Sequence, residues 1–145
     1  MVDAEVVSRR LFVLNDALAQ LASRKDAMTA VSLRNDPLLR AAVERWMQVA
    51  IEACVDLAYH VIADAGWVPA DSARGAFLRL TEHQVIPAEL ASRLGLAAGL
   101  RNILVHEYAE VDLALLAVAA RDGLSDLRQL GASIGVLLPR TDDAV

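Results

Sequence analysis

One apolar stripe constrains the fold of this chain more than any other feature. From Trp46 to Ala65, apolar residues recur at steps of three and four, the period of an α-helix with one buried face. Asn35-Asp36-Pro37 stands before the stripe and supplies a capping side chain followed by proline at the first helical position, while Gly66 follows it. The sequence therefore predicts one long helix, from about Pro37 to about Gly66, that other helices must cover.

Four further helices are expected around it. Residues 4–24 carry a one-sided apolar pattern, and Asp71 or Ser72 can cap a shorter helix that contains Phe77 and Leu80. Pro87 opens a fourth helix, and Asp112 starts a fifth that runs from Leu113 to about Leu130 or on to Leu138, despite Gly123 and Gly131. These patterns predict an all-α, antiparallel bundle of about five helices, with a single domain over residues 1–138 and a short polar tail over 139–145.

Composition limits the classes of function. Hydrophobic residues make up 56% of the chain but aromatic residues only 4%, which favours helices rich in Ala, Leu and Val over sheets. The formal net charge of -5 disfavours binding of nucleic acid through a broad basic surface, although one or two arginines in a cleft can still hold a phosphate. A single cysteine, no signal-like amino terminus and no apolar run near the ~20 residues of a membrane span predict a cytoplasmic protein without membrane contact.

The chemical groups gather in one octapeptide, Arg101-Asn102-Ile103-Leu104-Val105-His106-Glu107-Tyr108. On an ideal helix Arg101 and Tyr108 share one line, and Asn102 and His106 share the neighbouring line. Arg101 and His106 are then about 140° apart and flank a groove. The pattern suits a substrate that lies along the helix, or a second copy of the helix that faces it.

These residue types fit cleavage of RNA without a metal or other cofactor. His106 can take a proton from a 2'-hydroxyl or give one to the leaving 5'-oxygen near neutral pH. Arg101 can hold the scissile phosphate through two parallel hydrogen bonds, and Asn102 can orient the imidazole or a phosphate oxygen. Tyr108 offers a hydroxyl or a stacking surface. One histidine performs one proton transfer, so a second subunit could complete an acid–base pair.

Other titratable residues favour structural interpretations. His60 follows Asp56 by four residues and Glu52 by eight, which is compatible with an accessory group but is more typical of a solvated helix face with one Asp–His contact. His83 is expected at the surface, and Cys54 in the middle of the stripe is expected to be a buried thiol. No paired histidines or cysteines have the spacing of a zinc site.

The octapeptide resembles the motif of the HepT-like toxins in the HEPN superfamily of ribonucleases, in which Arg, a polar residue, three further residues and His-x-Tyr lie at the end of the penultimate helix. Residues 41–60 are similar to that family's long second helix, so the resemblance covers nearly the whole chain. It implies a homodimeric ribonuclease whose catalytic pair is Arg101 and His106, with Asn102 in support. It also implies a partner, an MntA-like nucleotidyltransferase antitoxin that transfers AMP to Tyr108.

Three functional hypotheses follow. The first is a metal-independent endoribonuclease toxin of a toxin–antitoxin pair, neutralised by AMPylation of Tyr108. A homodimer is expected, and a higher oligomer with the antitoxin stays open. The second is a HEPN-type helical subunit that partners a nucleotidyltransferase but cuts nothing. The third is a helical interaction protein with no link to nucleotides.

Overall fold

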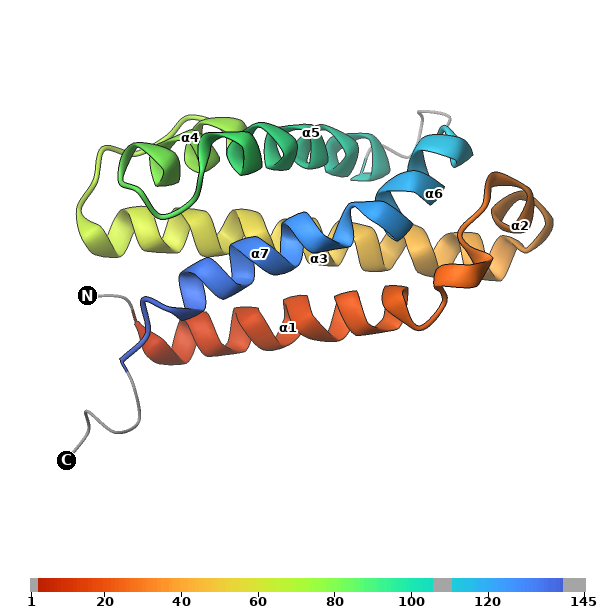
Figure 1. The fold of residues 1–145 in the computed structure, drawn as a ribbon, viewed down its shortest axis with the longest axis horizontal. Helices are drawn as coiled ribbons and strands as arrows, with labels where there is room; N and C mark the ends of the chain where they lie inside the picture. Colours follow the sequence, from red (N-terminus) through yellow and green to blue (C-terminus); the bar gives the residue numbers. More distant parts are fainter. Residues whose placement is uncertain (1–2, 106–110, 140–145) are drawn as a thin grey trace.

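A computed structural model describes residues 3–105 and 111–139, and within these ranges the chain is an all-α bundle (Figure 1). A single 3-10 turn, η1, covers Lys25–Ala27. The α-helices of the described ranges are, in chain order, α1 Ala4–Ala22, α2 Ala30–Asn35, α3 Pro37–Ala65, α4 Ala73–Glu82, α5 Ala88–Val105, α6 Leu113–Asp122 and α7 Leu124–Gly135. The predicted all-α fold class is confirmed.

Helix α3 is the long helix that the apolar stripe predicted. The side chain of Asp36 accepts a hydrogen bond from the backbone N–H of Leu39, and Pro37 is the first helical residue. The helix ends at Gly66, whose φ of 72° lies in the left-handed region that glycine adopts without strain. As Figure 1 shows, α1 runs antiparallel beside α3, and α4 and α5 cover another side of it.

Capping side chains begin three other helices at the predicted places. Asp3 caps α1, Ser72 caps α4 and Asp112 caps α6, each by accepting a hydrogen bond from a backbone N–H of the first turn. Of the two capping residues expected for α4, Ser72 is therefore the one used. The core of these helices is apolar, and no polar side chain of the described ranges is fully buried.

Two predictions about the elements were wrong. The single fifth helix expected from Leu113 to about Leu130 is two helices, α6 and α7, which meet at Gly123. A Cβ at Gly123 would lie 2.7 Å from the carbonyl oxygen of Ala119, so the bend depends on the missing side chain. The short helix α2 was not expected; Thr29 begins it by accepting a hydrogen bond from the N–H of Ser32. Figure 1 shows α2 at the same end of the bundle as α6, against which it packs.

Candidate functional site

Arg101 and Asn102 lie in the last turn and a half of α5. The helix reaches this point because residues 88–105 contain no proline and are rich in Ala and Leu, which are strong helix formers. Leu94, Ala98 and Leu100 are buried on the core side of α5, while Asn102 is exposed and Arg101 is half-buried. The core packing of α5 therefore holds the Arg101 side chain at the edge of the apolar core.

Within the described residues, the guanidinium group of Arg101 is incompletely paired. Its Nε is shielded from solvent, and no acceptor among the described residues receives a hydrogen bond from it. A buried donor without an acceptor costs the fold about 1–3 kcal/mol. An anion placed beside this nitrogen would remove that cost, and an arginine can bind a phosphate through two parallel N–H groups.

Two other predicted site residues, His106 and Tyr108, fall within 106–110 and lie outside the described residues. The helical lines that pair Arg101 with Tyr108 and Asn102 with His106 therefore stay predictions. Arg101 and Asn102 are adjacent in one helix, as expected, and consecutive residues of an α-helix are about 100° apart around its axis.

Glu52, Asp56 and His60, for which an accessory role was left open, have structural partners. Asp56 lies 3.4 Å from Arg10 in an ion pair that joins α3 to α1. His60 Nε2 lies 3.3 Å from Asp64 Oδ2, so the expected Asp–His contact exists, but with Asp64 four residues later instead of Asp56. Glu52 accepts a hydrogen bond from Gln48. In the described ranges no three potential metal ligands gather.

Cys54 is buried and His83 lies at the surface, as the sequence predicted. Cys54 is fully buried, its Sγ lies 3.8 Å from the carbonyl oxygen of Leu127, and burial raises the pKa of its thiol far above the usual range. The exposed His83 stacks on Trp67, with ring centroids 3.7 Å apart and planes 2° from parallel. This contact ties the end of α4 to the loop after α3.

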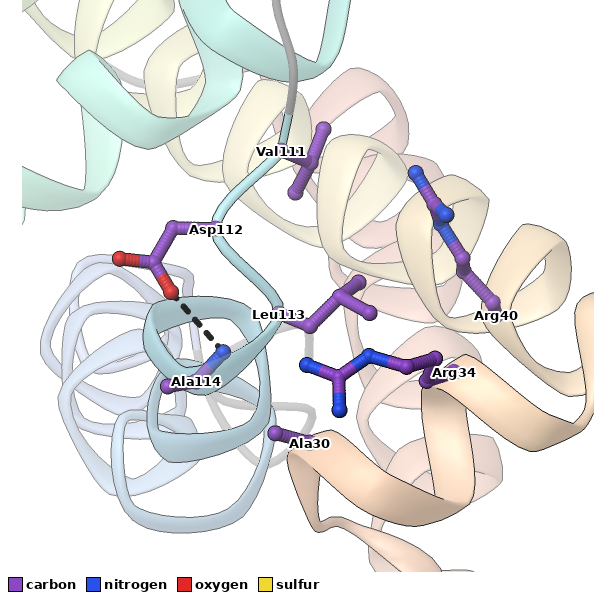
Figure 2. A pocket seen from close by; sticks show the side chains of 7 residues that line it. All are labelled: Ala30, Arg34, Arg40, Val111, Asp112, Leu113 and Ala114. Carbon is purple, nitrogen blue, oxygen red and sulfur yellow. Dashed lines mark hydrogen bonds between the residues drawn. The ribbon is translucent and has the colours of Figure 1, made fainter.

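A cationic cavity of about 560 Å³ lies where α2, the start of α3 and the start of α6 meet. Figure 2 shows Arg34 from α2 and Arg40 from α3 beside the segment from Val111 to Leu113, which follows the octapeptide in the chain. Neither arginine was predicted as a site residue, because α2, which carries Arg34 and places it near Arg40, was not expected. The capping pattern at Thr29 was the available signal.

An apolar groove of about 520 Å³ runs between α5, α6 and α7. Exposed apolar side chains lie along it, with Leu96 67% exposed, Leu115 50% and Ile103 39%. Large apolar side chains that share one exposed groove commonly mark a protein interface. The groove borders the same helix, α5, that carries Arg101.

The fold and this helix define the chain as an all-α helical bundle with Arg101 and Asn102 near the end of α5, and comparison with known proteins specifies the family. Residues 14–134, which include the whole octapeptide, match the family model "Ribonuclease HepT-like". The chain therefore belongs to the HepT-like ribonuclease family, as its motif predicted.

Two curated relatives and one solved structure agree with this assignment. The chain is 31% identical over 96 residues to the mRNA nuclease HepT of Shewanella oneidensis, covering 66% of this chain and 72% of the relative. It is 33% identical over 69 residues to the tRNA nuclease HepT of Aphanizomenon flos-aquae, covering 48% of this chain and 47% of the relative. The fold matches that of the tri-AMPylated Shewanella oneidensis HEPN toxin in complex with MNT antitoxin, with a TM-score of 0.82, 23% identity and coverage of 92% and 99% of the two chains.

In the part of the chain that the structure describes, no helix combines the length and the apolar character needed to cross a membrane.

Proposed function

We propose that this protein is an endoribonuclease toxin that cleaves RNA without a metal ion, with Arg101 and His106 as the catalytic pair. The observation that carries the proposal is the intact Arg-Asn-x3-His-x-Tyr motif within the region that matches the ribonuclease family. The Nε of Arg101, which has no acceptor within residues 3–105 and 111–139, supports it, because a phosphate could accept its hydrogen bond.

The proposed reaction is an internal transfer at phosphorus. The 2'-oxygen attacks the adjacent phosphorus as its proton leaves, the bond from phosphorus to the 5'-oxygen breaks, and that oxygen receives a proton. His106 performs one of the two proton transfers, and Arg101 opposes the charge that grows on the phosphoryl oxygens. Asn102 orients the imidazole or a phosphate oxygen. The products are a 2',3'-cyclic phosphate and a free 5'-hydroxyl.

A second subunit completes the site in this proposal. One histidine performs only one transfer, so the other is assigned to a partner copy in a homodimer. The apolar groove beside α5 supports this arrangement, because it supplies an exposed apolar face on the helix that carries Arg101. A dimer through this face would bring two copies of α5 close together.

We further propose that a nucleotidyltransferase related to MntA controls the toxin in the cytoplasm by AMPylation of Tyr108. The tyrosine oxygen would attack the α-phosphorus of ATP and displace pyrophosphate. The added phosphodiester carries negative charge two residues from His106, so it would compete with the scissile phosphate and repel RNA. The solved toxin of similar fold is itself AMPylated and bound to an antitoxin.

Replacement of His106 by Ala tests the catalytic proposal. Expression of the wild-type chain should arrest growth and fragment cellular RNA, whereas His106→Ala should do neither. Arg45→Gln is the matched control, since Arg45 is exposed and makes no ion pair among the described residues, and it should retain toxicity. Fragmentation that persists in His106→Ala would reject the catalytic role. Tight binding to a nucleotidyltransferase without any RNA products from the wild-type protein would favour a non-catalytic subunit.

Intact mass tests the regulatory proposal. Co-expression with an MntA-like nucleotidyltransferase should add mass in increments of AMP, and Tyr108→Phe should abolish them. Increments that remain in Tyr108→Phe would show that another residue is the acceptor.

A further inference from the structure

The cationic cavity formed by Arg34, Arg40 and residues 111–114 has no role in the proposed chemistry. Its walls come from three elements, α2, the first turn of α3 and the start of α6, so it depends on the tertiary fold. At about 560 Å³ it is large enough to admit a nucleotide-sized group. Its lining supplies two guanidinium groups within a chain whose net charge is -5.

Both arginines can bind an additional anion. Arg34 is exposed and forms no ion pair with any described residue. Arg40 contacts Glu44 at 3.0 Å through Nε alone, and this ion pair is partly exposed. The two terminal nitrogens of Arg40 have no acceptor among the described residues. Figure 2 shows the two guanidinium groups directed toward the segment from Val111 to Leu113.

The one carboxylate of the lining, that of Asp112, has a different partner. Its Oδ1 accepts hydrogen bonds from the backbone N–H groups of Ala114 and Leu115, at 3.0 and 3.1 Å. In Figure 2 this side chain points away from both arginines, toward the first turn of α6. The negative charge of Asp112 therefore stabilises the N-terminus of α6, and the lining keeps a net positive charge because it holds two guanidinium groups and one carboxylate.

We propose that this cavity binds a phosphodiester of the RNA strand next to the scissile bond, with Arg34 as the principal ligand and Arg40 beside it. Arginine matches this ligand because its planar group donates two parallel hydrogen bonds to one phosphate. Val111 follows Tyr108 by three residues, and three residues of extended chain span at most about 11 Å. The cavity thus anchors the strand near the motif, in a protein whose net charge otherwise repels RNA.

This inference rests on the proposed ribonuclease function and is tested by binding instead of cleavage. Binding of a short single-stranded RNA to the His106→Ala protein is measured across a series of salt concentrations. Arg34→Gln in that background should weaken binding several-fold and reduce the slope of log affinity against log salt by about 0.7, the value for one phosphate contact with a single strand.

Two variants serve as controls. Arg34→Lys keeps the charge and should retain the salt slope while losing some affinity. Arg45→Gln removes an exposed arginine of α3 that is about 140° around the helix from Arg40 and does not line the cavity, so it should leave affinity and slope unchanged.

Equal effects of Arg34→Gln and Arg45→Gln on affinity and slope would overturn the inference. An Arg34→Gln protein that binds RNA normally but no longer associates with the nucleotidyltransferase would also overturn it and assign the cavity to a protein partner. Cleavage that survives His106→Ala would instead reject the catalytic proposal, so the two failures are distinguishable.

Discussion

At the scale of single residues, Arg101 and Arg93 differ in how their Nε atoms are paired by the described part of the chain. The Nε of Arg101 is buried at the edge of the core without an acceptor among the described residues, whereas Arg93, two turns earlier on the same helix, donates from its own Nε to Asp126 at 3.0 Å. Groups that bind an anion in a reaction commonly remain incompletely satisfied until the anion arrives. Substitution of Arg101 by an apolar residue should therefore lower RNA cleavage without lowering the free energy of unfolding.

The substitution Arg101→Met tests this difference. It keeps most of the apolar stem but removes the Nε donor that no described residue pairs, so the free energy of unfolding should stay the same or rise, while RNA cleavage should fall about 10²- to 10³-fold. Arg93→Met is the matched control for stability and should lower the free energy of unfolding by up to about 1 kcal/mol, the typical value of an exposed ion pair. Urea denaturation and an RNA cleavage assay measure the two effects; a loss of several kcal/mol in Arg101→Met would contradict this interpretation.

At the scale of elements, two helical glycines have opposite surroundings. A Cβ at Gly131 in α7 would lie 2.9 Å from Cδ2 of the fully buried Leu14 in α1, so glycine allows these two helices to approach. A Cβ at Gly99 in α5 would meet no atom within 4 Å. Both positions lie inside helices, where glycine is less favourable than alanine by about 1 kcal/mol.

The two substitutions to alanine should therefore change the free energy of unfolding in opposite directions. In the separated subunit, Gly99→Ala should raise the free energy of unfolding by about 0.5–1 kcal/mol, and Gly131→Ala should lower it by about 1 kcal/mol because overpacking exceeds the gain in helix propensity. Urea denaturation at one protein concentration gives both values. A stabilising effect of Gly131→Ala would mean that α1 and α7 can separate without cost.

Most elements followed from local signals in the sequence, and the exceptions have physical reasons. The apolar stripe from Trp46 to Ala65 and the cap at Asp36 lie within α3, and the cap at Asp112 belongs to α6. Each of these signals involves residues of one helix only, so the helices could be predicted without knowledge of the tertiary fold. The break at Gly123 could not be predicted in this way, because the same residues are compatible with a continuous helix. The cationic cavity could not be predicted from the sequence either, because only tertiary packing brings Arg34, Arg40 and Val111 to the lining of one cavity.

At the scale of the whole molecule, the apolar groove between α5, α6 and α7 is the face that we assign to the homodimer. Leu115 and Ile103 border it and remain substantially exposed in a single chain. Burial of such side chains against a second copy would be favourable by roughly 25 cal/mol per Å² of apolar surface, before the costs of association are subtracted. In the mechanism that we propose, the second copy supplies the other His106.

Charge introduced into this groove should separate the subunits. Leu115→Glu should weaken the dimer by about 2 kcal/mol or more, roughly thirtyfold in its dissociation constant, and RNA cleavage should fall in parallel at low protein concentration. Phe12→Glu is the control, since Phe12 is 73% exposed on α1 and lies outside the groove. Sedimentation velocity measures both variants; dissociation caused by Phe12→Glu and not by Leu115→Glu would assign the interface to α1.

The most direct test of the central claim is cleavage of a defined RNA by the purified protein in the presence of EDTA. Wild type should release a fragment that ends in a 2',3'-cyclic phosphate, His106→Ala should release none, and a 2'-deoxy substitution at the cleavage site should block the wild-type reaction. Activity that disappears in EDTA and returns with a divalent metal, or equal cleavage by wild type and His106→Ala, would contradict the metal-free mechanism built on Arg101 and His106.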